Sequence, residues 1–131
     1  IYKMGIKNGN LQSVVEGLAE LMGADNLRPK FAFGLLKTYR LLLNRFEDYA
    51  TFRNEQILKL AEKDEEGNPK FIEGTQNVII STENIAALNE LDETEVEGVS
   101  PILLSELEAN VSTIKIETLV KLGNLVVEDA S

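Results

Sequence analysis

Residues 29–63 read PKFAFGLLKTYRLLLNRFEDYATFRNEQILKLAEK and decide the fold of this chain. Pro29 suits the first position of a helix, because its fixed φ matches helical geometry. No Gly or Pro follows Gly34 in this stretch, and residues 64–69, DEEGNP, carry strong stop signals. Apolar residues recur at mostly three- or four-residue spacing, namely Phe31, Leu35, Tyr39, Leu42, Phe46, Tyr49, Ile57 and Leu60. We therefore predict one amphipathic helix over residues 29–63, about 50 Å long.

A shorter helix is predicted over residues 11–22, with Asn10 as its N-cap and Gly23 at its end. Its apolar residues fall on one face, as an amphipathic helix requires. Only residues 24–28 separate it from the long helix, and so short a link favours an antiparallel pair. We expect a helical hairpin in which the shorter helix packs on the first half of the longer one.

The second half of the chain predicts short mixed elements. Residues 70–72 and 77–80 have the pattern of a strand hairpin, and Ser81 or Thr82 suits the N-cap of a helix that carries Ile85, Leu88 and Leu91 on one face. A last helix is expected to carry Ile116, Leu119 and Val120 on its apolar face. Residues 1–6, 95–99, 102–104 and 125–127 are predicted as strands, and residues 105–110 as a turn. The predicted class is α+β, a single domain over 1–131 with a helical hairpin (1–63) and an acidic mixed half (64–131).

Composition excludes several kinds of chemistry. The 131 residues are 44% hydrophobic and 27% charged, which is typical of one globular domain, and no apolar run approaches the roughly 20 residues that cross a bilayer. The chain has no Cys and no His, so it lacks the usual zinc ligands, a thiol nucleophile and the commonest general base. The acidic turn at 64–68 does not match a calcium loop, because Gly67 is fourth rather than sixth. We predict a protein that is not an enzyme, with no catalytic residue, metal or cofactor.

The net charge of −9 is unevenly distributed. Residues 1–63 hold 10 Lys and Arg against 7 Asp and Glu, a net of +3, whereas residues 64–131 hold 3 against 15, a net of −12. So acidic a half repels phosphates, and the basic residues of the long helix scatter around it with Glu47, Asp48 and Glu55 between them. Direct nucleic-acid binding is therefore not expected. The acidic half is interpreted either as a solvated surface or as a patch for a basic partner.

Three residues lie on the side of the long helix opposite its apolar stripe. Leu41 and Phe52 are about three turns apart, and Arg45 lies between them. Either another segment covers this back face, or Leu41, Arg45 and Phe52 form an exposed patch of the kind that protein partners bind. They are the candidate protein-binding residues.

Three segments carry a family resemblance. They are IKNGNLQSVVEGLAEL (6–21), LAEKDEEGNPKF (60–71) and EVEGVSPILLSELE (95–108), and the most specific part is KDEEGNP (63–69). The chain resembles an uncharacterised family of small proteins from phages and prophages of Gram-positive bacteria. The resemblance implies an accessory protein in the host cytoplasm and supplies no catalytic residues.

These observations favour a non-enzymatic phage accessory protein that binds a host or phage protein. One alternative is a structural or assembly factor that acts by self-association, and homo-oligomers are compatible with the sequence. Another is an acidic nucleic-acid mimic that presents Asp92, Glu93, Glu95 and Glu97 to a basic protein.

Overall fold

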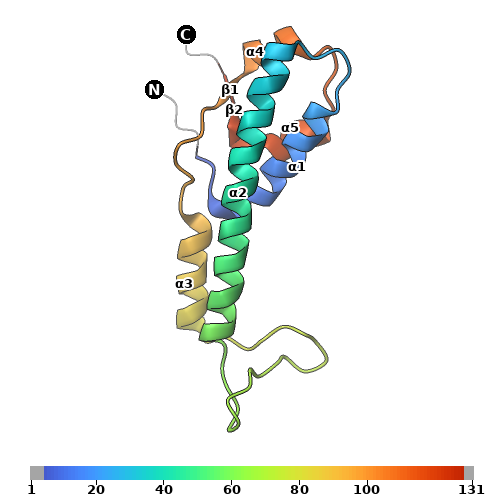
Figure 1. The fold of residues 1–131 in the computed structure, drawn as a ribbon. Coiled ribbons are helices and arrows are strands. Elements are labelled where there is room, and N and C mark those ends of the chain that lie inside the picture. Colours follow the sequence, from blue (N-terminus) through green and yellow to red (C-terminus); the bar gives the residue numbers. More distant parts are fainter. Residues whose placement is uncertain (1–4, 129–131) are drawn as a thin grey trace.

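The computed structural model describes residues 5–128, and most of them are helical (Figure 1). In chain order the elements are the 3-10 turn η1 (Asn8–Asn10), α1 (Leu11–Met22), α2 (Pro29–Leu60), α3 (Thr82–Glu93), β1 (Ile102–Leu103), α4 (Leu104–Asn110), α5 (Ile116–Leu122), the 3-10 turn η2 (Gly123–Leu125) and β2 (Val126–Val127). The two short strands pair in parallel, with Ile102 opposite Val126 and Leu103 opposite Val127. The class is therefore α+β with one long helix. Within residues 5–128, none of the helices combines the length and the apolar character needed to cross a membrane.

The long helix α2 begins at Pro29, as predicted, but it ends at Leu60 rather than at residue 63. The N–H of Ala61 still bonds the carbonyl of Ile57, yet the Ala61 backbone is extended, with ψ 144°. Ala61 pairs instead with Ile80, and Lys63 pairs with Pro69. The last three residues of the predicted helix thus belong to an irregular antiparallel ladder. At 32 residues, α2 is about 48 Å long.

The main core lies around the first half of α2. Helix α1 contacts both α2 and α5, and the three helices lie together at one end of the molecule (Figure 1). Phe31, Leu35 and Leu42 are buried on α2, and the predicted stripe continues with the partly buried Tyr39, Phe46 and Tyr49. The largest side chains that are almost fully buried are Ile6, Leu11, Val14, Leu18, Leu42, Leu107, Leu122 and Leu125. Most of the hydrophobic core of the described residues is therefore in this half of the molecule.

The distal half of the molecule is more slender. Helix α3 lies beside the second half of α2, and residues 61–80, here called the arm, extend beyond the end of both helices (Figure 1). The arm is held by backbone hydrogen bonds: Lys70 donates to Glu62 at 2.8 Å, and Ile79 donates to Lys70 at 2.8 Å. The predicted pairing of residues 70–72 with 77–80 is present as one bridge, Phe71 to Val78. It does not extend into continuous strands.

Several predictions for the remaining segments were wrong. Residues 105–110 belong to helix α4 rather than to a turn, because Leu107 enters the core and is 2% exposed. Residues 95–99 form no strand, and only Glu95 pairs, with Lys7. On α5 the buried residues are Thr118 and Leu122, whereas the expected core residues Ile116 and Val120 are 77% and 72% exposed. Of the strand predicted over 1–6, residues 1–4 lie outside the described part, and residues 5 and 6 are not in a strand.

Candidate protein-binding site

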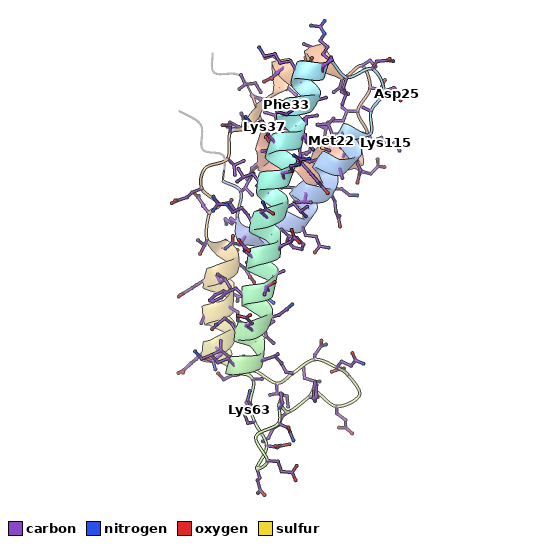
Figure 2. The ribbon with its side chains drawn as sticks, in the orientation of Figure 1. Met22, Asp25, Phe33, Lys37, Lys63 and Lys115 are labelled. Atoms are coloured by element: carbon purple, nitrogen blue, oxygen red, sulfur yellow. The ribbon has the colours of Figure 1, made fainter. Side chains whose placement is uncertain are left out.

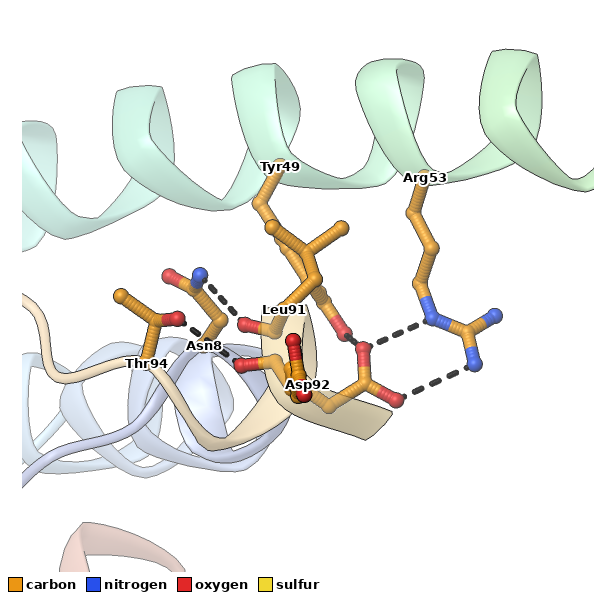
Figure 3. Close-up of polar contacts among 7 residues, drawn as sticks. Asn8, Tyr49, Arg53, Leu91, Asp92 and Thr94 are labelled. Atoms are coloured by element: carbon orange, nitrogen blue, oxygen red, sulfur yellow. Dashed lines mark hydrogen bonds and ion pairs between the residues drawn. The ribbon is translucent and has the colours of Figure 1, made fainter. Parts of the chain in front are cut away.

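A polar junction of Tyr49, Arg53 and Asp92 joins α2 to α3 in the distal half (Figure 3). Nε of Arg53 donates to Oδ1 of Asp92 at 2.8 Å, and Nη2 donates to Oδ2 at 3.1 Å. The hydroxyl of Tyr49 donates to the same Oδ1 atom. The side chains of Arg53 and Asp92 are 32% and 23% exposed, so water screens the pair only in part. The two-point geometry fixes the rotation of α3 against α2.

The electrostatics of the junction follow from these contacts. The hydrogen bonds from Arg53 hold the pKa of Asp92 below its usual value, and the hydrogen bond from Tyr49 acts in the same direction. Burial raises the pKa of Tyr49 to about 12, and the adjacent Asp92 carboxylate adds to this shift. Asp92 is therefore an ionised acceptor, and Tyr49 a neutral donor, at physiological pH.

Both ends of α3 are anchored. At its N-terminus the hydroxyl of Ser81 accepts the N–H of Asn84 at 3.3 Å, the N-cap that the sequence predicted as one of two residues. Nδ2 of Asn84 also donates to the carbonyl of Leu60 at 3.3 Å, which ties α3 to the end of α2. At its C-terminus Nδ2 of Asn8 donates to the carbonyl of Leu91 at 2.9 Å (Figure 3). Lys7 forms an ion pair with Glu93. Helix α3 is thus held in one position.

An apolar hollow opens where α2, α3 and the arm meet. Its volume is about 250 Å³, and we call it the distal hollow. Ile85 lies on its lining and is 47% exposed, so the hollow is open to solvent. Arg53 also lines it, and Nη1 of this guanidinium makes no hydrogen bond within residues 5–128. The lining residues are Arg53, Ile57, Asn77, Val78, Ile80, Ile85, Leu88 and Asn89.

The chemistry of this lining is suited to binding. Apolar side chains surround the hollow, and Arg53, Asn77 and Asn89 supply donors and acceptors that match a peptide backbone. The lining contains no carboxylate, hydroxyl or lysine that would act as a nucleophile or general base. Across the described residues, no three carboxylates gather in a group that would hold a metal ion.

The three predicted contact residues differ in their exposure and in their neighbours. Leu41 is only partly exposed and packs against the core, so it does not present an open apolar surface. Arg45 is exposed, and its Nη2 lies 3.8 Å from the position that a Cβ would occupy on Gly98. Phe52 is 49% exposed, nearer the distal end. The segment around Gly98 thus passes over part of the back face of α2, whereas Phe52 remains open.

The four acidic residues considered for nucleic-acid mimicry also differ, because two of them form ion pairs within the chain. Asp92 is paired with Arg53, and Glu93 with Lys7. Glu95 and Glu97 are exposed and line a groove with Arg45. Two of the four charges are therefore neutralised within the chain.

Sequence reasoning placed the five apolar lining residues of the distal hollow in predicted elements but did not bring them together. Ile57 belongs to the predicted stripe of α2, and Ile85 and Leu88 to the predicted face of α3. Val78 and Ile80 lie in the predicted hairpin. The hollow depends on the angle at which these three elements meet, and a local sequence pattern does not predict that angle.

Comparisons with known proteins find no match, since no family model, no curated protein and no solved structure matches the chain.

Proposed function

We propose that this protein is a non-enzymatic accessory protein that acts by binding another protein through its distal end. The observation that carries the proposal is the open distal hollow, in which Ile85 is 47% exposed among apolar neighbours. Four further large apolar side chains of this half are exposed by about half or more: Phe52, Leu58, Phe71 and Ile72. Apolar exposure of this extent is typical of protein-binding surfaces.

The rigidity of the site supports this proposal. The junction of Tyr49, Arg53 and Asp92 fixes α3, and the cap at Ser81 fixes its start. A site that is already formed before binding loses less conformational entropy when the partner docks. An apolar side chain of the partner would enter the distal hollow, and Arg53 would bond a backbone carbonyl beside it.

The charge around the site indicates the chemistry of the partner. Residues 47–94, which include α3 and the arm, hold 12 Asp and Glu against 4 Lys and Arg. A field of this sign accelerates the approach of basic surfaces and disfavours acidic ones. The partner we propose is a protein with an apolar anchor residue in basic surroundings.

In this proposal the helical hairpin of residues 1–63 is the scaffold, and the acidic half, residues 64–131, supplies most of the contact surface. Arg45 and Phe52 extend the contact along α2, and Leu41 supports them from the core side. The resemblance to small phage and prophage proteins makes the partner a host or phage protein in the host cytoplasm.

A nuclease-treated pull-down from Gram-positive host lysate, with and without infection, tests the proposal. The bait is compared with Ile85→Asp and with Ile116→Asp, a matched change of an exposed isoleucine on α5. We expect one stoichiometric protein with the unmodified chain and with Ile116→Asp, and loss of that protein with Ile85→Asp. Circular dichroism must show the same helical signal for all three.

Retention of the same partner by Ile85→Asp would contradict a role for the distal hollow. A second pair of baits, Phe52→Asp and Arg45→Glu, then tests the contact along α2. If none of these changes lowers the amount captured, the distal end is not the binding surface.

A further inference from the structure

The start of α2 is basic, whereas the arm beyond its other end is acidic. Residues 26–46 contain five basic residues and no acidic residue. Four exposed residues of this segment, Lys30, Phe33, Lys37 and Arg40, are spaced by three or four positions, so they share one face of the helix. We call this face the head stripe.

The head stripe is open and positively charged. Phe33 is 62% exposed, and Nζ of Lys37 lies 5.7 Å from the centre of its ring (Figure 2). The three ion pairs formed within residues 5–128 involve Lys7, Arg53 and Lys121, and none involves a residue of the stripe. An exposed aromatic ring among unpaired cations is suited to an acidic surface that also carries apolar groups.

A hollow of about 540 Å³ adjoins the head stripe, between the start of α2 and the segment that leads into β1. Lys30 and Gly34 belong to its lining, with Pro101 opposite on the other segment. Apart from the adjoining backbone of α2, no described atom lies within 4 Å of the position that a Cβ would occupy on Gly34, so the glycine leaves this part of the wall open. The hollow is large enough for an apolar side chain of a docked segment.

The arm has the complementary character. Residues 62–73 hold five acidic residues against two lysines, and Phe71 and Ile72 are 53% and 49% exposed. One of these lysines, Lys63, donates to the carbonyls of Leu58 and Ala61 instead of pairing with a carboxylate. The arm therefore presents both acidic and apolar groups to solvent.

The tip of the arm is ordered by its own hydrogen bonds. Oδ1 of Asp64 accepts the backbone N–H groups of Glu66 and Asn68, each at 2.9 Å. Within residues 5–128 the carboxylates of Glu65 and Glu66 have no ion pair. Their charges are held outward on a preformed turn, so little entropy is lost when the arm docks.

The arm of one chain cannot contact the head stripe of the same chain. About 35 Å of helix separates Lys37 from Leu60, and Figure 2 shows Phe33 and Lys37 far from Lys63 in the arm. We propose that the arm of one copy docks on the head stripe and the adjoining hollow of a second copy. Such a contact joins two different surfaces, so it is head-to-tail and leaves a free arm and a free stripe for further copies.

This self-association does not use the distal hollow, although it shares the exposed Phe71 and Ile72 of the arm with the proposed binding of another protein. Variants that change the hollow alone or the head stripe alone therefore separate the two proposals. Ile85→Asp, which places a charge in the apolar lining of the hollow, is expected to leave self-association unchanged. The charge changes described next are expected to alter self-association while leaving the hollow intact.

Sedimentation of the purified full chain tests the proposal. The average mass is expected to rise above the 14.5 kDa of one chain with concentration at about 0.01 M salt, where the Debye length is about 30 Å. It is expected to return to the monomer value at about 1 M salt, where that length is about 3 Å. A mass of one chain at every concentration at low salt would overturn the proposal.

Two variants identify the surfaces. The head variant carries Lys37→Gln with Arg40→Gln, and the arm variant carries Glu65→Gln with Glu66→Gln. Each is expected to remain monomeric alone, because one side of the contact is neutralised. Mixed one to one, they are expected to form a dimer and nothing larger, since one native arm and one native stripe remain.

Matched controls carry the same changes of charge elsewhere. Glu83→Gln with Glu90→Gln, on α3, and Lys59→Gln with Lys115→Gln are expected to associate like the unmodified chain. Association of both surface variants alone would overturn the proposal. So would a mixture that stays monomeric while the unmodified chain associates.

Discussion

Arg53 on α2 and Asp92 on α3 form a two-point ion pair, with Nε 2.8 Å from Oδ1 and Nη2 3.1 Å from Oδ2. This pair matters because the distal half has little apolar core of its own, and Leu88 is the only residue of α3 that is buried. The position of α3, and with it the shape of the distal hollow, depends on polar contacts. The distal half is therefore sensitive to the charge of Asp92.

Asp92→Ala is expected to lower the free energy of unfolding by about 1–2 kcal/mol. Hydrogen bonds to a charged group contribute about 1.5–3 kcal/mol, and partial exposure of both side chains reduces this figure. Urea denaturation followed by circular dichroism measures the change. Glu90→Ala, an exposed change on the same helix, is the control and is expected to cost less than about 0.5 kcal/mol. Equal losses in the two variants would show that the junction does not stabilise the fold.

Acid is expected to weaken the same contact. The pKa of Asp92 is lower in the folded chain than in the unfolded chain, where an aspartate titrates near about 3.9. The unfolded state therefore binds more protons as pH falls, and the contribution of Asp92, complete above about pH 5, is lost as pH drops through its folded pKa. Denaturation of the unmodified chain and of Asp92→Asn, each at several pH values, measures this. The difference between their free energies of unfolding should be largest near neutral pH and shrink in acid. A constant difference would contradict the shift.

Tyr49 gives the corresponding prediction at high pH. Its pKa of about 12 lies above the value of about 10 for an unfolded tyrosine, so its stabilising contribution is complete below about pH 10 and is lost as pH rises toward 12. Phenolate absorbance of the three tyrosines should contain one component near pH 12, and Tyr49→Phe should remove it. Asp92→Asn should move that component to lower pH, because the carboxylate contributes to the shift. If neither change alters the titration, the tyrosine with the raised pKa is not Tyr49.

The two long helical patterns were the parts of this fold that the sequence predicted well. The helix at residues 11–22 and the start of the long helix at Pro29 are confirmed, because each stretch has several turns of apolar spacing and a glycine or proline at one boundary. Helix α4 was missed because its seven residues are too few to display a period, and Leu107 alone enters the core. Short elements of this kind are decided by tertiary contacts rather than by local pattern.

The candidate site was predicted less well for a related reason. Helical projection correctly placed Leu41 and Phe52 on one side of α2, but it carried no information on which other segment covers that side. The chain near Gly98 passes beside Arg45, and Leu41 packs against the core. Predicting the distal hollow would have required the relative placement of α2, α3 and the arm, which the sequence pattern does not give. Whether Arg45 and Phe52 contact a partner stays a prediction.

Helix α5 shows how one close contact changes the buried face of an element. A Cβ on Gly17 of α1 would lie 3.0 Å from the backbone nitrogen of Leu122, so any larger residue there would require α5 to shift by a few tenths of an ångström. Thr118 is buried in the same contact, and its hydroxyl donates to Oε1 of Glu20 at 2.7 Å. The apolar pattern predicted Ile116 and Val120 as core because it could not register this glycine contact.

A pair of glycine substitutions tests that account. Gly17→Val is expected to lower the free energy of unfolding by about 1–3 kcal/mol, because the branched side chain would meet the backbone of α5 and force the helices apart. Gly34→Ala is the control: it is also within a helix, its Cβ would meet no atom within 4 Å outside the adjoining backbone of α2, and it should raise the free energy of unfolding by about 0.5–1 kcal/mol. Both changes remove a helical glycine, and the difference in helix propensity between valine and alanine is at most about 0.7 kcal/mol. Valine is still a better helix former than glycine, so a loss of stability for Gly17→Val isolates the close approach of α1 and α5. Urea denaturation at high salt measures both. A stabilising effect of Gly17→Val would show that α5 does not pack against Gly17.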